Sequence, residues 1–153
     1  MNPIFTYLKE LIKHRLAKEL NNQSLPIPVL SLENNNSHLA KYIKRRKLQN
    51  EDITLLLLAL IPKLDPSFLN GILSEFLPNG GEFVEFGGIK GKNHRGILPT
   101  AETLLYILGG TDIEGRMVIL KFLDNRSKLI KSKDITIERL PSSEPEMSGR
   151  LIL

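Results

Sequence analysis

The sequence contains no cysteine among its 153 residues. This absence excludes disulfide bonds, thiolate nucleophiles and thiolate metal ligands from the chain. A chain without cysteine suits a reducing compartment, so we expect a cytoplasmic protein. At this length, with 41% hydrophobic residues, it can form one domain, or a domain with an appendage, around a core without covalent cross-links.

Long apolar runs are also missing. The longest, from Leu55 to Ile61, is far shorter than the ~18 residues that a membrane-spanning helix needs. Near the N-terminus, Lys9 and Glu10 interrupt the apolar pattern that a secretory signal would require. The sequence therefore predicts neither a membrane span nor a signal peptide.

Motifs of enzyme active sites are absent as well. The sequence has neither a G-x-S-x-G nucleophile elbow nor an H-E-x-x-H pair, and His14, His38 and His94 lack the spacing of metal ligands. Glu85 and Glu102 could act as an acid/base pair. We favour local roles, in which Glu102 faces N–H groups in the first turn of its own helix and Glu85 pairs with a nearby cation. The sequence thus predicts a non-catalytic chain that holds no metal and no cofactor.

The net charge of +4 is unevenly distributed along the chain. Residues 1–50 hold nine Lys or Arg against three Asp or Glu, a net charge of +6. Residues 51–153 hold twelve against fourteen, a net charge of −2. We therefore expect any anionic partner to contact the N-terminal third.

The first fifty residues contain three predicted segments. Asn2 and Pro3 form a helix start, and apolar residues recur at helical spacing up to Leu20, which predicts an amphipathic helix. Residues 21–37 are rich in Asn, Ser and Pro, which indicates a linker. A short helix is predicted over 38–48, where Tyr42 is the aromatic residue available to stack on bases. Its basic cluster is the candidate contact for nucleic acid: Lys44, Arg45, Arg46 and Lys47.

Two helices are predicted at the start of the region 51–153. Asp52 favours a helix start through the macrodipole, and the following run is apolar on nearly all sides, so we expect deep burial and an end at Pro62. Asp65 is the predicted cap of the next helix, with Pro66 at its first position.

Further helices are predicted beyond a glycine-rich loop. Residues 82–86 have the pattern of a short strand or extended segment that leads into this loop. Thr100 caps a predicted helix that ends before Gly109. Thr111 and Glu114 form a predicted capping box for the next helix. The residues expected on the buried side of that helix are Ile113, Met117 and Leu120.

The end of the chain has the pattern of a hairpin. Residues 135–138 alternate with period two, and residues 150–153 form the expected return strand after a loop that contains prolines. Helices followed by a two-stranded wing predict a winged helix. We therefore expect a mainly α fold with a small β-hairpin, in which a winged-helix-like domain at 51–153 is preceded by an N-terminal helical extension at 1–50.

The glycine-rich loop is the candidate functional segment. Closely spaced glycines permit positive φ and close backbone approach, and Thr100 places the loop at a helix N-terminus. The loop departs from a phosphate-binding P-loop, which would need glycine in place of Phe86 and a hydroxyl residue in place of Asn93. We interpret it as a shaped loop that docks a protein. The candidate residues are Glu85, Phe86, Gly87, Gly88, Gly91, His94, Gly96, Pro99, Thr100 and Glu102.

These residues also carry a family resemblance. The pattern E-F-G-G-x-x-G, followed by H-x-G-x-L-P-T-x-E-T and an apolar helix that ends in Gly-Gly, resembles the N-terminal winged-helix domain of certain bacterial AAA-type ATPases. Some of these ATPases accompany contractile injection systems. The resemblance covers residues 52–153. It implies that ATP and Mg²⁺ bind only in a module downstream of residue 153. Because the sequence stops at Leu153 inside the expected return strand, we also expect the chain to be part of a longer protein.

The charge pattern of the predicted winged helix favours a protein partner over DNA. The helix that begins after Thr100 has no basic residue, and Glu144 and Glu146 lie at the expected wing tip, where phosphate would be repelled. The first hypothesis is therefore an accessory or regulatory winged-helix domain that binds protein, either its own ATPase module or an assembly component. The rival hypothesis is a DNA-binding regulator that uses the basic cluster at 44–47.

Overall fold

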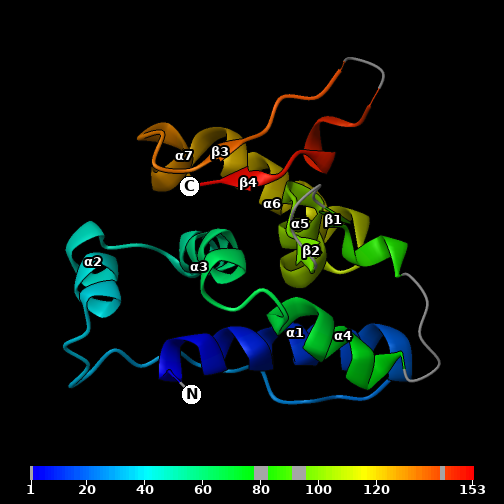
Figure 1. Ribbon diagram of the computed structural model, residues 1–153, viewed down its shortest axis with the longest axis horizontal. Helices are drawn as coiled ribbons and strands as arrows, with labels where there is room; N and C mark the ends of the chain where they lie inside the picture. Colours follow the sequence, from blue (N-terminus) through cyan, green and yellow to red (C-terminus); the bar gives the residue numbers. More distant parts are fainter. Residues whose placement is uncertain (1, 78–82, 91–95, 142–143) are drawn as a thin grey trace.

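The computed structural model describes residues 2–77, 83–90, 96–141 and 144–153. Within these ranges the chain is mainly helical, with two small antiparallel sheets of two strands each (Figure 1). The helices are α1 (Pro3–Asn21), α2 (His38–Arg46), α3 (Asn50–Leu64), α4 (Phe68–Phe76), α5 (Ala101–Gly109), α6 (Ile113–Asn125) and α7 (Lys128–Lys131). The 3₁₀ turns are η1 (Val84–Phe86) and η2 (Glu146–Ser148), and the strands are β1 (Ile89–Lys90), β2 (Ile97–Leu98), β3 (Thr136–Ile137) and β4 (Leu151–Ile152).

Helix α3 lies at the centre of the molecule, between α1 on one side and α7 with the β3–β4 hairpin on the other (Figure 1). Nine of its residues are buried, which confirms the predicted deep burial. The predicted end at Pro62 is wrong, because the helix continues to Leu64. A proline in the last turn removes only one helical hydrogen bond, and the Asp65 N–H still donates to the Ile61 carbonyl at 2.8 Å.

Helix α1 forms as the sequence predicts and belongs to the main hydrophobic core. The Asn2 side chain caps it by accepting a hydrogen bond from the Ile4 N–H at 2.8 Å, and Pro3 occupies the first turn. Its apolar side packs against α3, α4 and α5. The side chains of α1 that are completely buried are Ile4, Leu8, Ile12, Leu16 and Ala17. The linker then leads to α2 at one edge of the molecule (Figure 1).

Helix α4 begins two residues later than predicted. The Asp65 carboxylate accepts hydrogen bonds from the Ser67 N–H at 3.2 Å and the Ser67 hydroxyl at 3.0 Å. These bonds fold residues 65–67 into a turn, and the regular helix starts at Phe68. Asp65 therefore stabilises the turn before α4, and Pro66 lies within that turn.

The segment before the glycine-rich loop differs from its prediction. The short strand or extended segment expected at 82–86 is wrong for residues 84–86, which form the 3₁₀ turn η1. Phe83 has an extended backbone, and Glu82 lies outside the described residues. Phe86 stabilises the 3₁₀ turn, because it is only 1% exposed and its ring packs edge-on against Tyr106. Beyond η1, strands β1 and β2 pair antiparallel, with Ile89 opposite Leu98.

Helices α5 and α6 pack closely against each other. Thr100 caps α5 as predicted, with Thr103 completing the capping box. The predicted capping box of α6 is wrong, because Asp112 is the cap and accepts from the Gly115 N–H at 3.0 Å. The Thr111 hydroxyl instead donates a hydrogen bond to the carboxylate of Glu19 in α1, at 3.0 Å.

The buried side of α6 also differs from its prediction. The residues that face the core are Ile119, Phe122 and Leu123, with Leu120 partly buried, whereas Ile113 and Met117 are exposed. The reason is the close contact between α5 and α6. A side chain at Gly109 would come within 2.9 Å of the Arg116 backbone nitrogen, so α6 turns the side that contains Arg116 and Ile119 toward α5.

The predicted hairpin at the end of the chain is confirmed. Strands β3 and β4 pair antiparallel, with Thr136 opposite Ile152. An isolated bridge joins Thr100 to Arg150, so β4 also contacts the backbone that leads from β2 into α5. Arg150 pairs with the Glu138 carboxylate at 2.5 Å, and this interaction lowers the pKa of Glu138.

Within the described ranges, no single helix is both long enough and apolar enough to cross a membrane. Helices α3 and α4 reach the required length and apolarity only as a pair, and they meet at an angle of 104°.

Candidate functional site

Most of the predicted interaction loop is built into the fold. Four of its residues are buried and therefore contribute to packing inside the protein: Phe86, Gly96, Pro99 and Thr100. The Thr100 hydroxyl accepts a hydrogen bond from the Gly88 N–H at 3.2 Å, which ties the loop to the start of α5.

The glycines of this segment are required by close contacts. Gly87 has φ +75°, and a side chain there would meet the Glu102 Cβ at 2.8 Å. Gly88 has φ +91°, and a side chain there would collide with Ile97. Gly96 lies against the carbonyl of Pro66. These contacts explain the glycine pattern by packing.

The four other candidate residues of the loop are Glu85, Gly91, His94 and Glu102. Glu85 is exposed, whereas Gly91 and His94 lie outside the described residues. Glu102 pairs with Arg116 of α6 at 2.5 Å, in place of the expected contact with N–H groups of its own helix. Among the candidate residues that the structure describes, Glu85 is therefore the one with an exposed side chain.

Helix α6 carries an exposed apolar surface that the sequence prediction assigned to the core. Ile113 is 74% exposed, Met117 50% and Val118 54%. At 3.6 residues per turn, these three side chains share one half of the helix surface. Seven of the thirteen residues of α6 are apolar, which is more than one buried side requires, and this excess is the sequence signal for a second apolar side. We call the side chains of Ile113, Met117 and Val118 the α6 apolar surface.

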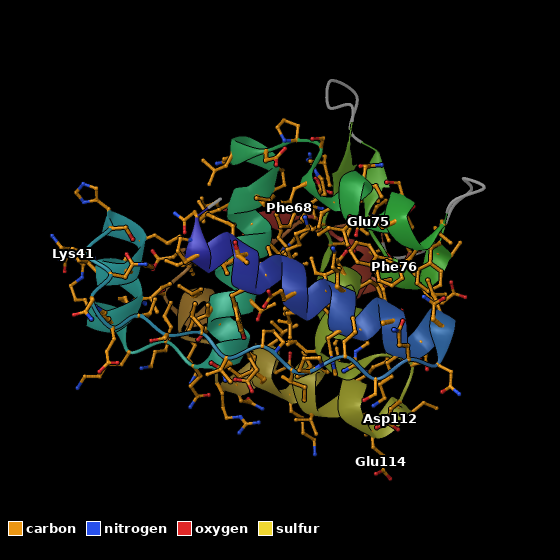
Figure 2. The ribbon with its side chains drawn as sticks, turned by 90° about the horizontal axis from the view of Figure 1, so that it is seen from below. Lys41, Phe68, Glu75, Phe76, Asp112 and Glu114 are labelled. Atoms are coloured by element: carbon orange, nitrogen blue, oxygen red, sulfur yellow. The ribbon has the colours of Figure 1, made fainter. Side chains whose placement is uncertain are left out.

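Charged residues lie beside and between the side chains of the α6 apolar surface, because Glu114 and Lys121 fall between Met117 and Val118 around the helix. Asp112 and Glu114 project from the N-terminal end of α6, as Figure 2 shows. Asp124 and Lys121 are exposed further along the helix. Arg116 is engaged, because its guanidinium pairs with Glu102 and donates to the Gly110 carbonyl at 3.2 Å. The outward face of α6 is therefore apolar and weakly acidic.

The basic cluster at 44–47 lies at the end of α2 and is partly engaged. Arg46 pairs with Asp134 at 2.5 Å and donates to Ser132 at 3.2 Å. The hydrogen bond from Arg46 lowers the pKa of Asp134. Arg45 and Arg46 both place their guanidinium groups over the Tyr42 ring, at 5.5 and 5.6 Å. Tyr42 is therefore occupied by its neighbours, while Lys44, Arg45 and Lys47 are exposed.

An open hollow lies along the β3–β4 hairpin. It has a volume of about 350 Å³ and is bordered by Ile137, Arg139, Pro141, Glu144 and Glu146. Glu144 and Glu146 are exposed, so the rim at this end of the hairpin is acidic.

The described residues contain no group of three or more His, Asp or Glu side chains that could hold a metal ion. His14 has a structural position, with Nδ1 within 2.7 Å of the Leu25 carbonyl, which holds the linker against α1. No family model, no curated protein and no solved structure matches this chain.

Proposed function

We propose that this chain is a cytoplasmic accessory or regulatory domain with a winged-helix-like fold, which binds protein through α6. The partner in this proposal is the module of an AAA-type ATPase, encoded in the same or a neighbouring reading frame. The ATPase part of the proposal is supported by the sequence resemblance over residues 52–153. The choice of surface is supported by the exposure of apolar side chains on α6.

The order of the elements supports a winged-helix-like fold. After α3 the chain passes through α4, η1 and the β1–β2 pair, then through the close pair α5 and α6 and the short α7, and finally through the antiparallel β3–β4 hairpin. The bridge between Thr100 and Arg150 links the strand before α5 to the hairpin. A winged-helix-like fold would make α6 the counterpart of the helix that reads the major groove in DNA-binding helix-turn-helix proteins.

The α6 apolar surface is the observation that carries the proposed protein-binding role. Three large apolar side chains exposed together are expected at a protein interface, where burial of apolar area supplies binding free energy. Asp112, Glu114 and Asp124 around them favour a partner surface whose apolar centre is bordered by cations.

The same face is unsuited to DNA. Helix α5 has no basic residue, and the exposed cation of α6 is Lys121, which is outnumbered by Asp112, Glu114 and Asp124. Glu144 and Glu146 add negative charge at the hairpin. Because DNA affinity depends on cations that neutralise phosphates, a regulator that reads DNA through α6 is the less supported function.

Calorimetric titration of the ATPase module into this chain tests the proposal. We expect the wild-type chain to bind, and Met117→Glu to weaken binding at least about tenfold, because it places a charge in an apolar interface. Val29→Glu is the matched control, since Val29 is 90% exposed in the linker and its change introduces the same charge.

Two results would contradict the proposal. Equal affinity of Met117→Glu and wild type would remove α6 from the interface. Absence of any P-loop ATPase from the same and the neighbouring reading frames would remove the proposed partner.

A further inference from the structure

Helix α7 brings a second group of cations against the basic end of α2. The Lys128 ammonium donates to the carbonyls of Arg46 and Lys47, at 3.1 and 2.9 Å, and caps the C-terminus of α2. Arg46 in turn contacts Ser132 and Asp134, which follow α7. Residues about eighty positions apart therefore form one surface.

This surface concentrates the positive charge of the protein. Helix α2 and its cap contribute Lys41, Lys44, Arg45, Arg46 and Lys47. The segment 128–134 contributes Lys128, Lys131 and Lys133, with Asp134 as its one carboxylate. We call residues 38–47 and 128–134 the α2–α7 basic surface. Its net charge is +7, and because the whole chain carries +4, the remaining residues sum to −3.

Most of these cations face solvent. Among the ion pairs between described residues, Arg46 with Asp134 is the one that involves this surface. The side chains of Lys41, Arg45, Lys47, Lys131 and Lys133 are all exposed. Lys41 lies at the outer edge of α2, at a different edge of the molecule from Asp112 and Glu114 of α6 (Figure 2). The basic end of α2 and the N-terminal end of α6 therefore lie at different edges of the molecule (Figure 2).

The composition of the α2–α7 basic surface favours nucleic acid over protein as its partner. The large apolar side chains that are exposed in the described residues lie on other elements, and none belongs to α2 or α7. Protein interfaces need an apolar centre and are depleted in lysine, whereas interfaces with nucleic acid are polar and strongly positive.

The contacts of Tyr42 with its neighbours indicate which mode of nucleic acid binding this surface allows. Its ring lies beneath Arg45 and Arg46, and its hydroxyl accepts a hydrogen bond from Arg46 at 2.9 Å. It is therefore not free to stack on unpaired bases. Exposed lysines act as point charges toward phosphate and carry no information about base sequence.

We propose that the α2–α7 basic surface binds the phosphate backbone of duplex nucleic acid without reading its sequence. Both helices take part, so α7 is as necessary as the cluster on α2. This surface acts independently of α6, and the chain can hold a protein partner and a nucleic acid duplex at the same time.

Fluorescence anisotropy of the full chain with two unrelated labelled 20-base-pair DNA duplexes tests this inference. We expect equal affinity for both duplexes, with an affinity that falls steeply as salt rises. Arg45→Gln with Lys47→Asn, and separately Lys131→Gln with Lys133→Asn, should each weaken binding on the order of tenfold at 0.1 M salt. Asn is chosen at 47 and 133 because both residues have positive φ.

The matched control is Lys18→Gln with Lys121→Gln, which removes two exposed cations from α1 and α6. This variant should retain at least half of the wild-type affinity. Circular dichroism and thermal unfolding verify that every variant folds.

Three results would overturn the inference. They are no binding at 50 mM salt, unchanged affinity in the α7 variant, and a loss in the control as large as in the α2 and α7 variants. A parallel titration with poly-L-glutamate identifies the other class of partner. Tighter binding to poly-L-glutamate than to the duplexes would assign the surface to an acidic polypeptide and would also overturn the inference.

Discussion

The carboxylate of Asp52, at the start of α3, accepts hydrogen bonds from the Ser127 hydroxyl at 2.5 Å and from the Lys128 N–H at 2.9 Å. Asp52 is only 1% exposed, and Ser127 is fully buried. The Ser127 hydroxyl also accepts from the Ile130 N–H at 3.2 Å, so it caps α7. This pair therefore fixes α7, and with it the lysines of the α2–α7 basic surface, to the central helix.

Removal of the Asp52 carboxylate should destabilise the protein. Asp52→Ala leaves the buried Ser127 hydroxyl and the part-buried Lys128 N–H without this acceptor, so we expect the free energy of unfolding to fall by about 2–4 kcal/mol. Urea denaturation measures this change. Asp124→Ala, on the exposed side of α6, should change stability by less than about 0.5 kcal/mol. A loss in Asp52→Ala as small as in this control would show that the pair contributes little.

Two glycine substitutions should have opposite effects. In Gly109→Ala the new methyl group would lie 2.9 Å from the Arg116 backbone nitrogen, so we expect a loss of about 1–3 kcal/mol as α5 and α6 separate. In Gly71→Ala the methyl group meets nothing within 4 Å on α4, so stability should rise by about 0.5–1 kcal/mol. Thermal unfolding compares the two variants. A stabilised Gly109→Ala protein would contradict the close contact between α5 and α6.

Removal of the Tyr106 hydroxyl should not destabilise the protein. This hydroxyl is buried without a hydrogen-bond partner among the described residues, and burial raises its pKa. Tyr106→Phe should therefore leave stability unchanged or raise it by up to about 1 kcal/mol, because an unpaired polar group is removed from the core. Tyr42→Phe, which removes a hydroxyl bonded to Arg46, is the control and should lower stability by about 0.5–1 kcal/mol. A marked loss in Tyr106→Phe would show that the hydroxyl is paired.

Stability at acidic pH should depend on Asp134. The hydrogen bond from Arg46, aided by Ser132, lowers the pKa of Asp134 in the folded state. The unfolded state then binds more protons near pH 4, so this contribution is present above the unfolded pKa of about 3.9 and is lost as pH falls through the lower folded pKa. Asp134→Asn should flatten the pH dependence of the free energy of unfolding below pH 5, measured with urea from pH 2 to 6. An unchanged slope would argue against the pair of Arg46 and Asp134.

Local signals in the sequence predicted much of the fold. Asn2 and Thr100 cap helices where the sequence places them, and the all-apolar run of α3 is central. The β3–β4 hairpin follows from alternation and from the intervening loop. In each case a few neighbouring residues determine the conformation, so a single sequence is sufficient.

Both candidate surfaces depend on contacts that a single sequence does not contain. On α6, apolar residues cover most of the helix, and only the close approach of Gly109 to Arg116 decides that Ile113 and Met117 face outward. The lysines of α7 belong to a region whose net charge is negative, and they reach α2 only through tertiary packing. Which side of α6 is buried, and which charged residues from distant segments lie side by side, can therefore be learned only from the structure.

Site-specific photo-crosslinking tests most directly the claim that α6 is the protein-binding surface. A benzophenone amino acid is placed at residue 117 in one protein and at residue 29 in another, and each is irradiated with the purified ATPase module. Both positions are exposed and apolar, and residue 29 in the linker is the more exposed of the two, so poor access cannot explain a missing crosslink there. The account predicts a crosslink to the module from residue 117 and none from residue 29. A crosslink from residue 29 alone, or no crosslink from residue 117 in a mixture that calorimetry shows to be bound, would contradict it.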